Sequence, residues 1–166
     1  MKQLWAPWRM AYIDEGKPEG CIFCDKPREK DSRAGLVLAQ TAHSVVMLNK
    51  YPYNNGHLLL APKRHANQFS FLPTEEYLDL CDALRLSLDI LARAFRPGGF
   101  NLGMNLGRPA GAGVEDHLHW HVVPRWEGDT NFMPVVGETR VMPQHLMDNY
   151  DRLSPLFKDA MASERV

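Results

Sequence analysis

The sequence predicts an α+β fold, with an antiparallel sheet of about five strands, one long helix and a second helix near the C-terminus. Two observations predict it. Short apolar, β-branched runs between turn residues occupy 36–63, and the apolar period then changes to intervals of three and four over 74–95. Strand-like runs return after this segment, and the order of strands, helix and strands favours an α+β arrangement.

The first three expected strands lie close together in the sequence. Residues 36–40 (LVLAQ) and 44–50 (SVVMLNK) are aliphatic and β-branched and are separated by TAH, which predicts a hairpin. The segment 51–56 (YPYNNG) is dense in turn residues, and 57–63 (HLLLAPK) is typical of a third strand that its proline ends. Residues 1–34 are rich in Pro, Gly and charge, so we expect loops and short irregular elements there.

An amphipathic helix is expected over 74–95, with two glutamates in its first turn and PGG after its end. Its apolar residues recur at intervals of three and four and form the stripe that we expect to be buried: Tyr77, Leu80, Cys81, Leu84, Leu88, Leu91 and Phe95. Beyond the helix, 100–107 (FNLGMNLG) and 117–126 (HLHWHVVPRW) predict the fourth and fifth strands. A last amphipathic helix is expected over much of 143–162.

Composition limits the possible functions. The 166 residues are 45% hydrophobic and 23% charged, the profile of one soluble globular domain. A formal net charge of −1 provides no overall field for nucleic acid or an anionic membrane, so any phosphate must be bound by a local site. The apolar runs are far shorter than the roughly 20 residues that span a bilayer, and the N-terminus lacks the apolar run of a signal peptide. We therefore expect a cytoplasmic protein with neither nucleic acid nor membrane as a partner.

The sequence HLHWHVV (117–123) places three of the seven histidines at alternate positions. Alternate side chains of a strand share a face, so His117, His119 and His121 would line one face while the apolar residues between them face the core. A single such histidine is usually structural, but three beside a glycine-rich loop favour a functional site. They do not suit one tetrahedral zinc ion, because the outer two α-carbons would lie roughly 13 Å apart and zinc–nitrogen bonds are about 2 Å.

A row of imidazoles suits an extended anion, with one ring attacking phosphorus and a neighbour donating hydrogen bonds. Imidazole has an ordinary pKa of about 6.5, and its attacking nitrogen keeps its lone pair when an acceptor holds the proton of the other nitrogen. The covalent nucleotidyl-imidazole can then pass to water, phosphate or an amine. The loop GRPAGAG (107–113) can turn backbone N–H groups toward phosphate oxygens, because glycines tolerate the required dihedral angles.

HLHWHVV matches a His-φ-His-φ-His-φ-φ motif, where φ is apolar, and the chain therefore resembles the histidine triad (HIT) superfamily. NKYPYNNGHLLLAPKRH before the long helix and GFNLGMNLG after it resemble the family's strands in the same order. The resemblance covers about residues 19–127 and implies a single HIT domain over 1–166, a HIT-like fold and a homodimer. LWAPWRMAYI and PRWEGDTNF resemble a bacterial and mycobacterial subset that includes diadenosine tetraphosphate phosphorylases.

The resemblance also implies roles for individual residues. His119 would be the nucleophile that attacks the α-phosphate of an AMP-containing substrate, His121 the donor to phosphate and leaving-group oxygens, and His117 a partner that fixes the tautomer of His119. The nucleotide would be bound by His121 and by residues at matching family positions: Asn49 at the ribose, Asn105 at the phosphates, His57, Gly113 and Val114. A buried, hydrogen-bonded structural histidine is the alternative for His57.

One departure concerns the loop before the histidines. Gly113 and Val114 stand where many family members have Gln followed by Ser or Thr. Main-chain N–H groups must then do more of the phosphate binding, which leaves room for phosphate itself to act as the acceptor.

Three cysteines, an odd number, argue against a pure disulfide scaffold. Cys21 and Cys24 form the turn CIFC, which is redox-active, structural or half of a zinc site. Resemblance to zinc-binding bacterial HIT proteins implies His65, in PKRH, and His117 as the other two ligands of a structural zinc ion. The competing interpretation leaves the thiols free and His117 wholly in the active site.

Three functions stay open from the sequence. The favoured one is a nucleotidyl hydrolase or transferase that acts on dinucleoside polyphosphates, such as diadenosine tetraphosphate, or on nucleoside phosphoramidates, through a nucleotidyl-histidine intermediate. The second is a diadenosine tetraphosphate phosphorylase that yields ADP and ATP. The third is a non-enzymatic module that binds a purine nucleotide, and the intact histidine triad argues against it.

Overall fold

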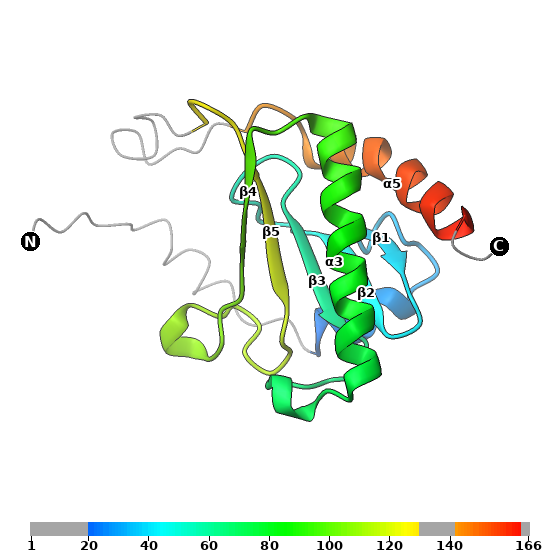
Figure 1. Ribbon diagram of the computed structural model, residues 1–166, viewed down its shortest axis with the longest axis vertical. Coiled ribbons are helices and arrows are strands. Elements are labelled where there is room, and N and C mark those ends of the chain that lie inside the picture. The colour runs from blue at the N-terminus through cyan, green and yellow to red at the C-terminus, as the bar shows by residue number, and fades with distance from the viewer. Residues whose placement is uncertain (1–19, 130–141, 164–166) are drawn as a thin grey trace, which may run out of the picture.

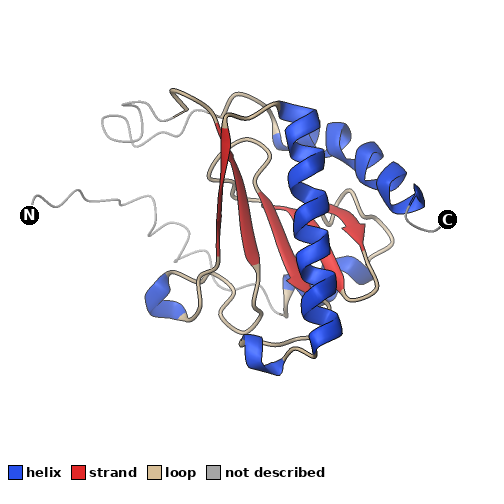
Figure 2. Ribbon diagram, in the orientation of Figure 1, coloured by secondary structure: helices blue, strands red, loops and turns tan. Residues whose placement is uncertain are grey.

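The protein forms one antiparallel sheet with two long helices on one face (Figure 1, Figure 2). The structure is a computed structural model, and it describes residues 20–129 and 142–163. The sheet order is β1-β2-β3-β5-β4. Its strands are β1 (Val37–Gln40), β2 (Ser44–Leu48), β3 (Leu58–Pro62), β4 (Gly99–Gly103) and β5 (Trp120–Arg125). The helices of the described ranges are α2 (Ile22–Asp25), α3 (Thr74–Phe95) and α5 (Leu146–Ser163). The expected α+β class and the antiparallel sheet of five strands are confirmed.

The fifth strand begins later than the alternating pattern predicts. Its first ladder pairs join Trp120 to Leu60 of β3 and His121 to Gly103 of β4. Before Trp120 the chain leaves both neighbours. The ladder with β3 stops at the Leu60–Trp120 pair although β3 continues to Pro62, and β4 ends at Gly103 instead of continuing to residue 107. His117 and His119 therefore lie in an extended segment that precedes the strand.

The larger core lies between the sheet and the helices, on what we call the helix-covered face. It combines residues of β1, β2, β3 and β5 with Leu80, Ile90 and Leu91 of α3 and Leu153 and Phe157 of α5, all of which are buried. Trp120 and Val122 of β5 contribute to this core. The apolar residues that alternate with the histidines thus pack where the sequence placed them.

The buried side of α3 is rotated from the predicted stripe. Tyr77 was expected in the core but is 44% exposed, and Cys81 is only partly buried. Glu76 is buried in place of Tyr77, because Arg64 of the preceding loop donates to its carboxylate at 2.6–3.1 Å. The remaining buried positions on this side include small residues, Ala83, Ser87 and Ala94, which allow the helix to lie close to the sheet.

A second, smaller core lies on the opposite side of the sheet, which we call the histidine face. Its buried members are Phe23, Val37, Val45, Met47, Leu59 and Ala61. Phe23 comes from the short α2, which follows Cys21. Leu59 is paired with His121 across the ladder, so the histidine side chain projects to this face. No described helix is long and apolar enough to cross a membrane.

Candidate active site and metal-binding cluster

The three histidines of the motif line the histidine face with their rings close together. His117 is fully buried, His119 is 5% exposed and His121 is partly buried. The ring centroids of His119 and His121 lie 5.0 Å apart. The ring of His57, also fully buried, lies 5.2 Å from that of His121 and extends the row by a fourth imidazole.

The tautomer of His119 is fixed by the main chain. Its Nδ1 lies 2.8 Å from the carbonyl oxygen of His117. A carbonyl can only accept, so Nδ1 carries the proton and the neutral ring keeps its lone pair on Nε2. Burial lowers the pKa of His119 and outweighs the opposing effect of this hydrogen bond, which favours the neutral ring at physiological pH.

The tautomer of His121 follows from a chain of two hydrogen bonds. The main-chain N–H of Tyr53 donates to Nδ1 of His57 at 3.0 Å, so the proton of His57 must be on Nε2. That Nε2–H donates to Nδ1 of His121 at 3.0 Å, so the proton of neutral His121 is on its own Nε2. Burial, with a smaller contribution from His119, lowers the pKa of His121 to about 4. Neighbouring rings thus present opposite groups: a lone pair on His119 and an N–H donor on His121.

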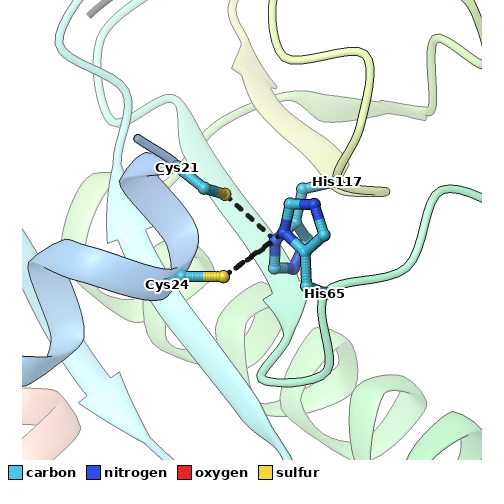
Figure 3. Close-up of side chains that lie close together, drawn as sticks. All are labelled: Cys21, Cys24, His65 and His117. Carbon is cyan, nitrogen blue, oxygen red and sulfur yellow. Dashed lines mark hydrogen bonds between the residues drawn. The ribbon is translucent and has the colours of Figure 1, made fainter. Parts of the chain in front are cut away.

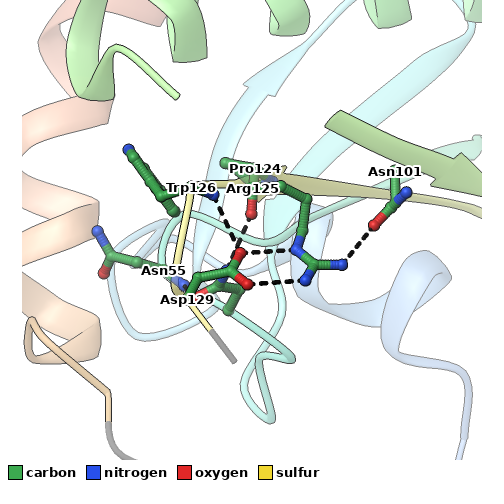
Figure 4. Close-up of polar contacts among 7 residues, drawn as sticks. Asn55, Asn101, Pro124, Arg125, Trp126 and Asp129 are labelled. Carbon is green, nitrogen blue, oxygen red and sulfur yellow. Dashed lines mark hydrogen bonds and ion pairs between the residues drawn. The ribbon is translucent and has the colours of Figure 1, made fainter. Parts of the chain in front are cut away.

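The turn that carries Tyr53 is tied to the end of β5. Asn54 donates through Nδ2 to the carboxylate of Asp129 at 2.7 Å. Asp129 accepts two further bonds at 2.7 Å from Arg125, whose Nη1 donates to Asn101 of β4 at 2.7 Å. Figure 4 shows the Arg125 guanidinium between Asp129 and Asn101. This network of β4, β5 and the turn fixes the position of the Tyr53 N–H group, and Arg125 is therefore more than the ordinary surface residue that its sequence position suggests.

Asn49 lies beside the histidine row. Its Oδ1 accepts from the main-chain N–H of Tyr51 at 2.9 Å, and its Nδ2 lies 3.3 Å from Nδ1 of His57. Asn105 lies in the loop after β4, where its Nδ2 donates to the carbonyl of Gly111 at 3.3 Å. The first of these asparagines supports the imidazole row, and the second supports the glycine-rich loop.

The glycine-rich loop forms a tight turn that satisfies three of its own N–H groups. Gly107 and Gly111 have φ of 81° and 91°, values that favour glycine. Three N–H groups that the sequence offered to phosphate instead donate to carbonyls inside the turn, namely those of Ala110, Gly111 and Ala112. Gly113 is exposed, and Val114 packs beside the smaller core. These three N–H groups are therefore not available to phosphate, whereas those of Gly113 and Val114 donate to no carbonyl of this turn.

Two cysteines and two histidines converge at the start of α2 (Figure 3). Sγ of Cys21 lies 3.2 Å from Nδ1 of His117, and Sγ of Cys24 lies 3.4 Å from Nδ1 of His65. All four ligand atoms lie within 4.8 Å of one another. A tetrahedral zinc ion with such ligands has edges of roughly 3.3–3.8 Å, so this cluster could hold a metal ion.

Protonation in the cluster also suits metal binding. Nε2 of His117 donates to the carbonyl of Pro62 at 2.7 Å, which leaves the lone pair of Nδ1 facing the sulfurs. Burial lowers the pKa of His117 to about 4, so this ring is neutral. Burial, with a smaller effect of Cys21, raises the pKa of Cys24 to about 11, so metal binding would release its proton.

His117 contributes different atoms to the cysteine–histidine cluster and to the histidine row. Its ring faces the cysteines, and its carbonyl faces His119. The sequence left two interpretations of His117 open, a metal ligand or an active-site residue. They are compatible, because one concerns its ring and the other its carbonyl.

Three groups that contact the histidine rings of the candidate site were not predicted from the sequence. They are the Tyr53 N–H group, the Pro62 carbonyl and the ring of Phe23, which lies 4.8 Å from that of His119. Main-chain groups are the same in every residue and leave no signal in a sequence. Phe23 had one available signal, since it is the aromatic residue inside the CIFC turn.

The HIT domain family matches residues 30–128 of this chain. The chain is 38% identical over 157 residues to AP-4-A phosphorylase of Mycobacterium tuberculosis (strain ATCC 25618 / H37Rv), covering 89% of this chain and 80% of that protein. It is 33% identical over 105 residues to adenosine 5'-monophosphoramidase hnt1 of Schizosaccharomyces pombe, covering 63% of this chain and 74% of that protein.

Solved structures share the fold. A Zn-bound histidine triad family protein from Mycobacterium smegmatis superposes with a TM-score of 0.64 at 20% identity, covering 86% of this chain and 96% of that one. Plasmodium falciparum diadenosine triphosphate hydrolase gives a TM-score of 0.63 at 22% identity, covering 95% of each chain. With the family match and the histidine row in place, the chain belongs to the HIT domain family.

Proposed function

We propose that this protein is an enzyme that transfers a nucleotidyl group from an AMP-containing substrate through a covalent intermediate on His119. The observation that carries the proposal is the pair of opposite tautomers, which places a lone pair on His119 beside an N–H donor on His121. Dinucleoside polyphosphates and nucleoside phosphoramidates are the substrate classes, in line with the names of the M. tuberculosis and S. pombe relatives.

The proposed reaction has two steps. Nε2 of His119 attacks the α-phosphorus, a P–N bond forms, and the bond to the polyphosphate or amine leaving group breaks. The ring of His119 becomes positively charged, and the carbonyl of His117 stabilises that charge through Nδ1–H. His121 donates from Nε2 to a phosphate oxygen or to the leaving group. In the second step water, or another acceptor, breaks the P–N bond and releases AMP or an AMP adduct.

Nucleotide binding is proposed for the residues around this row. Asn49 is the candidate for the ribose because it lies beside His57, and Asn105 is the candidate near the phosphates because it holds the glycine-rich loop. Gly113 and Val114 would offer main-chain N–H groups to the phosphates, since their side chains have none to give.

Phosphorolysis is the second candidate reaction. It is favoured by the relative named AP-4-A phosphorylase, which is 38% identical to this chain. A loop with Gly113 and Val114 also leaves space and N–H groups for inorganic phosphate as the acceptor. In that case the adenylyl group passes from His119 to phosphate and gives ADP, and ATP is the other product of diadenosine tetraphosphate.

One experiment tests both reactions. The protein is incubated with diadenosine tetraphosphate with and without inorganic phosphate, the products are separated, and the quenched protein is mapped for an adenylylated histidine. We expect the adduct on His119, AMP without phosphate if the enzyme is a hydrolase, and phosphate-dependent ADP if it is a phosphorylase. His119→Ala should abolish turnover, and His43→Ala, outside the histidine row, is the matched control. Binding without turnover by the native chain would instead favour the non-enzymatic module.

Zinc is the metal that we propose for the cysteine–histidine cluster. Two thiolates and two neutral imidazoles are the donor set that zinc prefers in closed structural sites, and the four ligand atoms already converge. The ligands would be Cys21, Cys24, His65 and His117, and the ion would connect α2 to the segment after β3 and to the histidine row. Elemental analysis of the purified protein tests this, with about one zinc per chain expected.

A cytoplasmic homodimer is the assembly that we propose. β4 lies at the end of the sheet order, and Leu102 and Leu106, in and after this strand, are 44% and 50% exposed. A second copy would cover this apolar edge. Sedimentation equilibrium should therefore give twice the mass of the chain, and Leu102→Lys should lower that mass.

A further inference from the structure

Phe23, which lies between the two cysteines of the cluster, packs directly against the histidine row. Its side chain is 1% exposed. Its ring centroid lies 5.1 Å from that of His117 and 4.8 Å from that of His119, and the planes of Phe23 and His119 are inclined by only 33°. The cysteine turn thus places an aromatic ring over the imidazole that has the lone pair on Nε2.

The same turn also contacts His117, which in turn is hydrogen-bonded to Nδ1 of His119. Cys21 and Cys24 face Nδ1 of His117 at 3.2 and 3.6 Å. The carbonyl of His117 in turn accepts the Nδ1–H bond of His119 at 2.8 Å. His117 is 0% exposed, so the surrounding protein holds both its ring and its carbonyl in place.

The position of His119 needs such support, because it lies outside the strand ladder. His121 is paired with Leu59 on one side and Gly103 on the other. His119 precedes the first residue of β5 and has no ladder partner in the described sheet. The preceding residue, Leu118, is held by one main-chain bond to Ala66 at 2.7 Å.

We propose that the Cys21–Cys24 turn positions the nucleophile, because it carries the Phe23 ring that fixes the plane of the His119 imidazole and so keeps Nδ1 aligned with the His117 carbonyl. The inference rests on the proposed function of His119. Phe23 is a positioning residue, since it acts through the His119 ring against which it packs. A metal ion in the cluster would fix the turn and so would keep the Phe23 ring in place. The cluster then serves catalysis as well as the stability of the N-terminal segment.

Phe23→Leu tests the proposal, with Phe157→Leu as the matched control. Both residues are fully buried phenylalanines, but Phe157 lies in α5, in the core on the opposite side of the sheet. Leucine keeps an apolar side chain at each position, so both variants are expected to fold. Two properties are measured: kcat and KM with diadenosine tetraphosphate, and the ring ¹⁵N signals of His119 without substrate.

We expect Phe23→Leu to lower kcat about 10-fold with KM changed less than about 2-fold, because the ring of the nucleophile is misaligned. Its His119 signals should change from a single Nδ1–H tautomer to a mixture of tautomers, because a ring that tilts out of its plane loses the hydrogen bond to the His117 carbonyl. Phe157→Leu should leave kcat and these signals unchanged. Removal of the metal with a chelator should alter the His119 signals in the same direction as Phe23→Leu.

The proposal is overturned if Phe23→Leu keeps the native kcat and the single Nδ1–H tautomer. It is also overturned if both Phe variants lower kcat equally, since general destabilisation would then explain the loss. The ring signals separate this inference from the proposed function. If the native chain has no turnover but Phe23→Leu still changes the His119 tautomer, the enzymatic function fails and the positioning role stands.

Discussion

The two faces of the sheet are built in different ways. The helix-covered face buries sixteen clustered residues from four strands and two long helices. The histidine face buries a cluster of six, and its cover is the cysteine turn, with four histidine rings at its border. The first face is packed mainly by apolar side chains, whereas polar groups of the second form the hydrogen-bonded histidine row and the cysteine–histidine cluster.

Because the two faces are built differently, substitutions on them should change different properties of the protein. Substitutions on the helix-covered face should change the free energy of unfolding and leave the chemistry of the folded protein intact. Substitutions on the histidine face should do the reverse, because its polar groups are held in defined protonation states. Each of the following experiments compares the two faces.

The largest effect is expected for His119→Ala. Removal of the nucleophile should lower kcat at least about 1,000-fold, because no other group can form the P–N bond. The free energy of unfolding should change far less than this loss of activity implies. Steady-state turnover and thermal unfolding of the same preparation provide the measurement. A variant that kept a tenth of the native kcat would assign the nucleophile to another residue.

Leu153→Ala is the counterpart on the helix-covered face. Leu153 is fully buried between α5 and the sheet, and its truncation should lower the free energy of unfolding by about 2–5 kcal/mol. Denaturant unfolding gives this value. The folded fraction should retain the native kcat, and a selective fall of kcat at unchanged stability would show that the two faces are not independent.

Loss of a metal ligand should weaken the histidine face alone. His65 is exposed, so His65→Ala removes a ligand without opening a cavity, and metal affinity should fall at least about 10-fold. Hydrogen exchange should then become faster in residues 21–25, while α3 keeps its protection. His43→Ala is the control. Equal loss of protection in α3 would mean that the cluster supports the whole fold.

The smallest expected effect is the pH dependence of stability. The pKa of His121 is about 4 in the folded protein and about 6.5 when unfolded, so the unfolded chain takes up the proton first as pH falls. The free energy of unfolding should therefore decrease between about pH 6.5 and 5, where most carboxylates stay ionised. His121→Gln should have a flatter profile in this window. An identical slope in both proteins would contradict the low pKa of His121.

The pH at which activity is lost should lie below the ordinary pKa of histidine, which is about 6.5. Because burial lowers the pKa values of His119 and His121, their neutral tautomers persist below pH 6.5. The acid limb of kcat/KM is expected below this pH. A half-maximal kcat/KM at pH 6.5 would indicate that the rings titrate like solvent-exposed imidazoles.

Most of the fold could be predicted from patterns of apolar residues. The period over 74–95 matched α3, and alternation in HLHWHVV correctly separated the apolar side from the histidine side. The orientation of α3 could not be predicted, because Glu76 is buried only through its ion pair with Arg64, a contact between elements. The start of β5 was missed for a similar reason, since pairing with the neighbouring strands determines it and β4 ends at Gly103.

Only those parts of the candidate site that consist of characteristic side chains could be predicted from the sequence. The cysteine turn and alternating histidines are visible in the sequence, and the resemblance to the HIT family added the distant His65. The resemblance implied that His117 sets the tautomer of His119, and its carbonyl accepts the Nδ1–H bond. The N–H of Tyr53 and the carbonyl of Pro62, which set the tautomers of the other rings, were not expected. These groups occur in almost every residue, so only the fold selects them.

The most direct measurement is the tautomeric state of His119 and His121 by ¹⁵N NMR of the histidine-labelled protein at neutral pH. We expect the proton on Nδ1 in His119 and on Nε2 in His121, with both rings neutral. The same tautomer in both rings, or a proton on Nε2 of His119, would remove the nucleophile and contradict the proposed chemistry.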